Sequence, residues 1–234
     1  MADTMLFVVF PYAAVIVAVV MSVYRYFDRR FTYSSLSSQL LENGALSWAS
    51  VAWHYSIIVI LLAHLLAALF PGVWAALLGG QARLVVIEAT GMGMGLIAVL
   101  SMALFIWRRL ARPRARAVTS WGDWVLLIAL LAQVVLGLVV AFGYRWGSVW
   151  YLHTAAPWLG SLVRLDPQIA AITPLPWLIK LHFLGGFVIV ALIPFTRLVH
   201  IVTIPVGYLW RPYIVVIWNR RRAPHRAGLS ADKQ

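Results

Sequence analysis

The sequence predicts an all-α integral membrane protein with five transmembrane helices. Hydrophobic residues make up 63% of its 234 residues, charged residues make up 11%, and the mean hydropathy is +0.88. This composition lies far from that of a soluble globular domain, so we expect the protein to be solvated by lipid. The charges fall between and after five apolar runs, which is the layout that membrane topology produces. We expect a single domain over residues 1–234 that crosses the inner (plasma) membrane several times.

Each apolar run is long enough to cross about 30 Å of hydrocarbon as a helix. The expected spans are 5–24, 46–70, 84–107, 122–143 and 176–204. The first span is too long in its apolar part for a signal peptide and lacks a small-residue cleavage pattern, so we expect it in the mature chain. The segment 144–175 contains several prolines and should form a short interfacial helix or a re-entrant turn on the outer face.

Basic residues predict the orientation of these spans, because cytoplasmic loops are enriched in Lys and Arg. One set of connections carries most of them: Arg25, Arg29, Arg30, Arg108, Arg109, Arg112, Arg114, Arg116, Arg211, Arg220, Arg221, Arg222, Arg226 and Lys233. The opposite loops hold only Arg83, Arg145, Arg164 and Lys180. We therefore expect the N-terminus outside (periplasmic) and the C-terminus in the cytoplasm.

The residues that are absent exclude several functional classes. No cysteine is present, which removes disulfides, thiolate metal sites, cysteine-ligated iron–sulfur clusters and covalent c-type heme attachment. A net charge of +12 would suggest a nucleic-acid partner in a soluble protein, but here the basic residues flank apolar spans. We therefore expect a lipid membrane and no nucleic acid as partner, and histidine is the strongest candidate metal ligand.

Four of the six histidines fall inside predicted spans: His54 and His64 in the second, and His182 and His200 in the fifth. Imidazole in lipid is costly unless it is paired or ligating, so these residues are functional candidates by default. Because the two spans run in opposite directions, His54 and His200 share the inner half of the bilayer, and His64 and His182 share the outer half. Crossed pairing would place ligands at opposite depths and is excluded.

Helix geometry supports this pairing in part. If the fifth helix is unbroken, the 18 residues from His182 to His200 complete about five turns, which places both on one face. The ten residues from His54 to His64 leave those two roughly 80° apart. The axial spacings also differ, at about 15 Å and about 27 Å, so helix tilt and cofactors set off the helix axis would have to absorb the mismatch.

Two bis-histidine hemes b use all four residues, with His54 and His200 on an inner heme and His64 and His182 on an outer heme. Such ligation leaves no open position on the iron, which suits electron transfer. A copper or zinc site would need several ligands at one point, and the depths disfavour it. His153 and His225 are expected to be ordinary exposed residues.

Other residues in the spans bear on the same site. Arg197, one turn from His200, needs an anionic partner, for which a heme propionate is a candidate; snorkelling to the interface is the alternative. Several glycines could make room for a macrocycle or simply allow close helix packing: Gly91, Gly93, Gly95, Gly185 and Gly186.

These residues also carry a resemblance over nearly the whole chain. The matching stretches are Arg25-Tyr26, Thr32-Tyr33, Ser37-Ser38-Gln39, the spacing of His54 and His64, Pro113-Arg114-x-Arg116-Ala117, Lys180-Leu181-His182 and, most specifically, residues 194–213, PFTRLVHIVTIPVGYLWRPY. In these the chain resembles the gamma, or cytochrome b, subunit of membrane-bound respiratory nitrate reductase. The resemblance implies two hemes b on the four histidines, with menaquinol or ubiquinol as electron donor. It also implies an iron–sulfur beta subunit and a molybdenum-cofactor alpha subunit as partners.

The resemblance implies that the quinol site lies at the start of the third span. A lysine that serves this pocket in the family is replaced here by Arg83, whose planar, permanently charged group is not equivalent to an ammonium. Glu88, about one turn deeper, could accept or relay a proton. The alternative is that Arg83 is an interfacial anchor and Glu88 a packing carboxyl bonded to a neighbouring helix.

Two other functions remain open from the sequence. The chain could be a non-redox membrane anchor or proton-relay protein whose histidines and Glu88 titrate without heme. It could also be the equivalent diheme, quinol-linked subunit of another reductase or of a nitrite oxidoreductase-like complex. For the leading function, we expect the soluble partners to contact the loops at 25–45 and 108–121 and the tail after residue 211.

Overall fold

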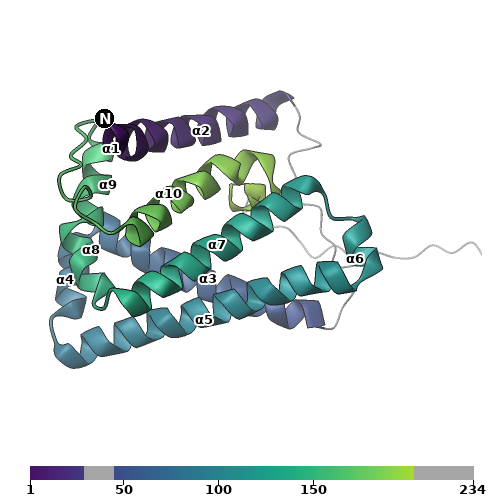
Figure 1. Ribbon diagram of the computed structural model, residues 1–234, viewed down its shortest axis with the longest axis horizontal. Coiled ribbons are helices and arrows are strands. Elements are labelled where there is room, and N and C mark those ends of the chain that lie inside the picture. Colours follow the sequence, from purple (N-terminus) through teal and green to yellow (C-terminus); the bar gives the residue numbers. More distant parts are fainter. Residues whose placement is uncertain (29–44, 203–234) are drawn as a thin grey trace, which may run out of the picture. The chain divides into compact units, whose positions relative to one another are not determined.

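The computed structural model describes residues 1–28 and 45–202, and within these ranges the regular structure is entirely helical. Five helical stretches are long and apolar enough to cross a membrane, which confirms the predicted fold class (Figure 1): Ala2–Asp28, Trp48–Leu69, Gln81–Ala111, Trp121–Gly143 and Trp177–Phe195. Most of the predicted 25–45 loop, the tail after residue 211 and His225 lie outside the described residues.

The first span is one continuous helical run, α1 (Ala2–Thr4), the π-helical η1 (Met5–Val9) and α2 (Phe10–Asp28). The second span is α3 (Ala45–Leu69), and the third is α5 (Gln81–Ala111). Between them lies a short helix, α4 (Pro71–Leu78), which was not predicted from the sequence. It begins with a proline, which is tolerated because a backbone N–H in the first turn would have no acceptor within the helix.

The fourth span, α7 (Trp121–Gly143), follows the short helix α6 (Pro113–Ala117) and starts at a capping box. The hydroxyl of Ser120 accepts from the backbone N–H of Asp123, and the Asp123 carboxylate accepts from the backbone N–H of Ser120. This reciprocal arrangement satisfies two donors at the helix start. The outer segment then forms two helices, α8 (Gly147–His153) and α9 (Ala155–Val163), where a short interfacial helix or a re-entrant turn was expected.

The fifth span breaks where the sequence analysis expects a continuous helix. Helix α10 (Trp177–Leu192) is followed by two short 3-10 segments, η4 (Ile193–Phe195) and η5 (Arg197–Ile201). Pro194 cannot donate a helical hydrogen bond, and Thr196 between the two segments is extended, with φ −126° and ψ −178°. Arg25 of α2 donates to the Pro194 carbonyl oxygen. The expected helix over 176–204 is therefore wrong.

Because of this break, His182 and His200 do not lie on one continuous helix. The expectation that five whole turns place the two residues on one helix face is therefore wrong. The axial spacing of about 27 Å, which assumed 1.5 Å per residue throughout, fails for the same reason. The chain turns after Leu192 instead of continuing along the helix axis, as Figure 1 shows beyond the end of α10.

The spans pack side by side in the order α2, α10, α7, α5 and α3, each against the next. Helices α3 and α10 are not among the pairs of described elements whose backbones pack closely. A core of Trp53, Ala98, Met102, Leu127 and Val134 joins α3, α5 and α7. The two helices that bear most of the span histidines are thus held in place through α5 and α7.

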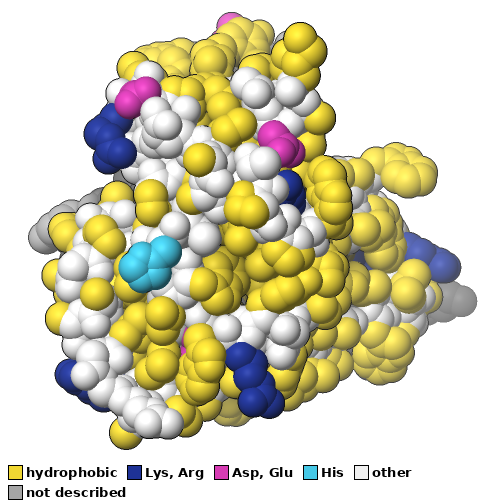
Figure 2. Space-filling model, turned by 60° about the vertical axis from the view of Figure 1, so that its left-hand side comes forward, with side chains coloured by type: hydrophobic (Ala, Val, Ile, Leu, Met, Phe, Trp, Pro, Cys, Tyr) yellow, Lys and Arg dark blue, Asp and Glu magenta, His cyan; other side chains and the backbone are white. Residues whose placement is uncertain are grey.

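The spans bury little of their surface within the chain. Between 17% and 22% of the apolar windows is buried, and many large hydrophobic side chains on all five spans are exposed. Figure 2 shows hydrophobic side chains over much of the face it presents, with few charged groups among them. This is the surface expected of helices that are solvated by lipid.

Candidate functional site

The four span histidines lie in two pairs, each joining α3 to the C-terminal part of the described chain. The ring centroids of His54 and His200 are 6.1 Å apart, and those of His64 and His182 are 6.4 Å apart. His54 and His64 project from α3, whereas His182 lies on α10 and His200 on η5. These are the same pairings that the depth argument gives.

Three of the four rings are held by a backbone carbonyl of their own segment. The distances from Nδ1 to the oxygen are 2.7 Å for His54 and Ser50, 2.8 Å for His64 and Ile60, and 2.7 Å for His200 and Arg197. A carbonyl oxygen can only accept, so in neutral rings Nδ1 carries the proton and Nε2 is unprotonated. Such a bond fixes the tautomer and the orientation of an imidazole that binds metal through Nε2.

His182 is held in a different way, by residues of the neighbouring helix α7. Its Nδ1 atom is buried and has no hydrogen-bond partner among the residues that the structure describes. Gln133 donates from Nε2 to the His182 carbonyl oxygen at 2.9 Å. A Cβ atom added at Gly137 would lie 2.9 Å from Cε1 of His182, which is too close for two carbon atoms. The ring therefore lies directly against the backbone of α7.

The two pairs fit a metal held between two imidazoles. Imidazole nitrogens about 2 Å from a shared metal ion place their ring centroids roughly 6 Å apart, close to the separations of 6.1 Å and 6.4 Å. In the described ranges, no group of three or more His, Cys, Asp or Glu side chains is placed to hold a metal ion. Each pair thus offers two donors, which is the axial ligand set of a six-coordinate heme b, and the residues fit that group.

The glycines expected near a macrocycle divide into two kinds. A Cβ atom at Gly95 would lie 3.1 Å from a leucine of α7, and one at Gly185 would overlap Oε1 of Gln133, so both allow close helix packing. At Gly91 and Gly93, nothing lies within 4 Å of an added Cβ atom. These two positions leave space beside α5.

Next to the first pair, Asp123 of α7 binds Arg197 of η5 through two hydrogen bonds. Nε of Arg197 lies 2.5 Å from Oδ1 and Nη2 lies 3.1 Å from Oδ2. An anionic partner for Arg197 was expected, with a heme propionate as the candidate, and Asp123 was not singled out from the sequence. The signal that could have found Asp123 is the capping-box pattern from Ser120, which places an acid at the start of the span. The propionate contact stays a prediction.

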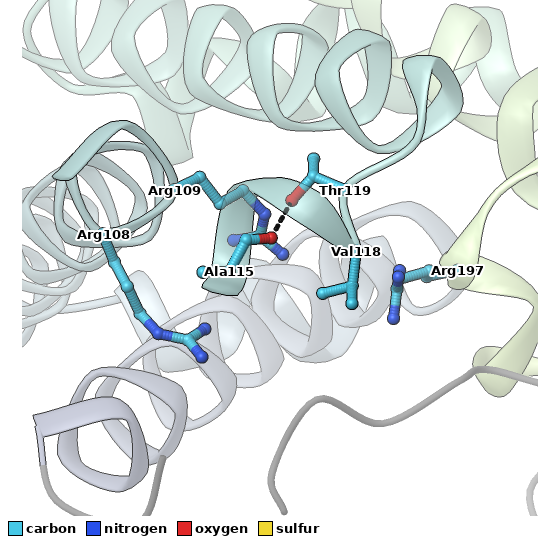
Figure 3. A pocket seen from close by; sticks show the side chains of 6 residues that line it. All are labelled: Arg108, Arg109, Ala115, Val118, Thr119 and Arg197. Carbon is cyan, nitrogen blue, oxygen red and sulfur yellow. Dashed lines mark hydrogen bonds between the residues drawn. The ribbon is translucent and has the colours of Figure 1, made fainter. Parts of the chain in front are cut away.

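A small pocket lies where α5, α6, the residues that follow α6 and η5 meet, and Figure 3 shows its lining. The residues that line it are Arg108, Arg109, Ala115, Val118, Thr119 and Arg197. Nη1 of Arg109 donates to the Phe105 carbonyl oxygen at 3.2 Å, and the Thr119 hydroxyl donates to the Ala115 carbonyl oxygen at 2.7 Å. Three guanidinium groups line this pocket, and one of them, that of Arg197, is bound to the Asp123 carboxylate.

At the other end of α3, His64 lies against helix α8. The rings of Tyr151 and His64 meet edge-on with centroids 5.9 Å apart, and the Tyr151 hydroxyl donates to the His64 carbonyl oxygen at 3.4 Å. Burial raises the pKa of Tyr151 to about 12, so the phenol stays protonated at neutral pH. His153, at the end of α8, is exposed, as predicted.

The two quinol-site candidates both lie on α5 but in different settings. Oε1 of Glu88, which is half-buried, accepts from the backbone N–H of Ser148 at 2.8 Å and from the Ser148 hydroxyl, so it caps the start of α8. Arg83 is exposed, and its guanidinium packs over Gly79, where an added Cβ atom would lie 3.3 Å from Nη2. Glu88 thus has the bonded partner that the packing alternative expects, and the quinol role of both residues stays a prediction.

Lys180 is buried, although it was counted among the charges of the outer loops. Its Nζ atom donates to the Thr173 carbonyl oxygen at 2.7 Å and lies 3.7 Å from Oδ1 of Asp3. The same atom lies 5.8 Å from the ring centroid of Phe7 and 5.3 Å from that of Trp177. Lys180 therefore fastens the start of α10 to the N-terminal helix, two residues before His182.

Comparison with known proteins gives a consistent picture. A family profile described as nitrate reductase gamma subunit matches residues 3–219. The nitrate reductase gamma chain of Bacillus subtilis is 30% identical over 224 residues, which cover 92% of this chain and 98% of that protein. The respiratory nitrate reductase 1 gamma chain of Escherichia coli is 29% identical over 213 residues, which cover 90% and 95%.

A longer relative shows the same similarity in one part of its length. The nitrate reductase-like protein NarX of Mycobacterium tuberculosis is 31% identical over 220 residues, which cover 92% of this chain. The chain spans about a third of that protein, 34% of its length.

Proposed function

This chain belongs to the nitrate reductase gamma subunit family, and we propose on that premise that it is the quinol-oxidising cytochrome b subunit of a respiratory nitrate reductase. It is a multi-pass protein of the inner membrane. In the proposed role it takes electrons from quinol near the outer face and delivers them to soluble iron–sulfur and molybdenum-cofactor subunits on the cytoplasmic side.

The observation that carries the proposal is the pairing of four imidazoles across α3 and the C-terminal part of the described chain. His54 and His200 would hold an inner heme b, and His64 and His182 would hold an outer heme b. The centroid separations of 6.1 Å and 6.4 Å support this. When bound there, heme b would supply one-electron transfer.

The distribution of arginines supports the proposed orientation. Arg25, Arg108, Arg109 and Arg112 lie at the ends of α2 and α5 that are connected to the predicted cytoplasmic loops. Arg197 shares a pocket with Arg108 and Arg109, so a carboxylate such as a propionate would find a cationic surrounding there. This end is also where the soluble partners would dock, because their redox centre must approach the inner pair.

The quinol site is proposed at the opposite end, around the start of α5. Arg83, exposed there, would donate a hydrogen bond from its guanidinium to a quinol oxygen. Glu88 would accept or relay a proton as quinol is oxidised, and its bond to Ser148 would hold the carboxylate in place. Proton release outside combined with electron delivery inside would make the reaction electrogenic.

Difference spectra test the proposal directly. Membranes that contain the chain should show reduced-minus-oxidised bands of b-type heme, and pyridine hemochrome analysis should give two hemes per chain. Addition of a menaquinol or ubiquinol analogue should reduce them. Pure protein that absorbs only in the ultraviolet would overturn the proposal and favour a membrane anchor without a redox role.

A further inference from the structure

We infer that α7, which carries no histidine, positions both imidazoles of the C-terminal half: Asp123 positions His200, and Gln133 with Gly137 positions His182. The inference rests on the proposed function, because it takes these histidines as axial ligands of heme. Asp123, Gln133 and Gly137 are positioning residues in this account. They act through the chain around each ligand and are not ligands themselves.

His200 needs an external anchor because its segment is not an α-helix. Its Nδ1 atom bonds to the carbonyl oxygen of Arg197 in a short 3-10 turn, whereas His54 and His64 bond to carbonyls of the long helix α3. A 3-10 turn is short and has weaker hydrogen-bond geometry than an α-helix. The position of the Arg197 carbonyl must therefore be set by contacts outside the turn.

Asp123 supplies that contact. It binds the Arg197 guanidinium through two hydrogen bonds, it is only 5% exposed, and it is itself fixed by the reciprocal bonds with Ser120 at the start of α7. A continuous set of bonds thus runs from α7 through Arg197 to the ring of His200. Two hydrogen bonds between a carboxylate and a guanidinium fix the orientation of the guanidinium as well as its distance. Asp123 can therefore hold Arg197, whose carbonyl oxygen orients the His200 ring, in one position.

His182 needs an anchor for a different reason. It is the one span histidine whose Nδ1 has no partner among the described residues, so no bond to its own helix orients the ring. Gln133 holds the backbone of His182 through a 2.9 Å bond to the carbonyl oxygen, and the Gly137 backbone supports the ring. Gly185 lets Gln133 reach α10, because a Cβ atom there would overlap Oε1.

The three positions share one face of α7. At about 100° per residue, Asp123, Gln133 and Gly137 lie within roughly 80° of one another around the helix and span about 21 Å along it. That face is the one turned to α10 and η5, since all three residues contact them. One rigid helix can therefore set the two ligands at two depths, although the chain between them is broken at Pro194.

The experiment compares variants whose effects should fall on different hemes. Asp123→Asn removes the charge that binds Arg197, and Asp166→Asn is its control, because it makes the same change at an exposed acid that bonds to Gln168 in the outer segment. Gly137→Ala adds a methyl group against His182. Gly143→Ala is its control on the same helix, where nothing lies within 4 Å of an added Cβ. Heme content, low-spin EPR signals and the midpoint potential of each heme are measured on purified protein.

We expect Asp123→Asn to alter the inner heme alone and Gly137→Ala to alter the outer heme alone, with about a 10- to 100-fold loss of heme affinity at the affected site. Asp123→Glu should restore part of the inner signal, and both controls should match the wild type. The unaffected heme in each variant shows that the chain has folded.

The inference is overturned if either variant keeps the g-values, potentials and content of both hemes, or loses both hemes together. Absence of heme b from the wild type would be a failure of the proposed function instead. The two failures are therefore distinguished by the unmodified protein.

Discussion

The imidazole rings of His54 and His200 lie with centroids 6.1 Å apart, although His54 belongs to the long helix α3 and His200 to a 3-10 turn beyond the end of α10. The second pair, His64 and His182, has nearly the same separation, 6.4 Å, with both partners on α-helices. The two pairs thus have similar ring separations although their local backbone structures differ, and each pair can be tested separately.

Replacement of a single ligand should remove one heme and leave the other. His54→Ala or His200→Ala should remove the inner heme, and His64→Ala or His182→Ala the outer one, because an iron with one axial imidazole is poorly held. Heme content should fall by about half in each variant, as measured by pyridine hemochrome analysis and EPR. His153→Ala, at an exposed histidine, is the control. Two intact six-coordinate hemes in any of the four ligand variants would disprove the assignment.

Quinol oxidation should depend on the start of α5. In Arg83→Ala and Glu88→Gln, quinol-dependent reduction of the hemes should slow by about 10- to 100-fold while both hemes are retained, since a donor or a proton acceptor is lost. Stopped-flow absorbance with a menaquinol analogue measures this rate. Arg164→Ala removes another outer-segment charge and serves as a control. Unchanged rates with both hemes present would mean that the quinol pocket lies elsewhere.

The chain should purify as part of a larger complex. Mild detergent extraction should recover it with subunits that contain iron–sulfur clusters and molybdenum, which metal analysis and mass spectrometry can detect. The physical reason is that, in the proposed function, electrons from the inner pair would need an acceptor within reach on the cytoplasmic side. A stable lone chain with full quinol-to-acceptor activity would contradict this expectation.

Trp158 should be a major contributor to stability in the outer segment. It is 1% exposed, donates from Nε1 to the Phe7 carbonyl oxygen at 2.9 Å, and stacks on Phe183 at 5.6 Å between centroids. Trp158→Ala should lower the free energy of unfolding by about 3–5 kcal/mol. Trp121→Ala, at a residue that is 86% exposed, should change it little. Unfolding in mixed detergent micelles, followed by circular dichroism, compares the two.

Tyr151 should give stability a specific dependence on pH in the alkaline range. Its pKa rises from 10.0 to about 12 because burial disfavours the phenolate. As the pH rises, the unfolded chain therefore loses this proton first, and the free energy of unfolding falls between about pH 10 and about pH 12. Below that range the phenol is protonated in both states, so it adds no pH dependence to stability. The slope of unfolding free energy against pH should be smaller in Tyr151→Phe. An equal slope in both proteins would show that the phenol is not desolvated.

The five spans could be predicted from the sequence for physical reasons, and the rings that lie close together are those that depth pairs, whereas their role as heme ligands stays a prediction. Long apolar runs are the strongest signal of a membrane helix, and the expected pairs came from depth alone, which depends only on chain direction. The break in the fifth span was missed even though Pro194 stands in the sequence, because apolar character continues through residues 193–202 and conceals the end of the helix. Helix α4 was missed in the same way, inside an apolar connection.

The supporting residues could not be predicted because their roles are tertiary. Asp123 looks like an ordinary cap from its neighbours, and nothing nearby in sequence indicates that its carboxylate binds Arg197. Gln133 is a polar residue in the middle of an apolar span, which is a signal worth following, but its partner on α10 is 49 positions away. Gly137 matters only because a particular ring lies against it.

The packing of the first helix against α10 has a consequence for biosynthesis. Arg25 bonds to the Pro194 carbonyl oxygen, Tyr12 to the Leu162 carbonyl oxygen, and Lys180 fastens α10 to the N-terminal end. The first span is made before the fifth and can form these contacts only after the fifth has been inserted. In the proposed function, α3 would likewise gain both of its histidine partners only at that stage, so cofactor loading would follow insertion of the fifth span.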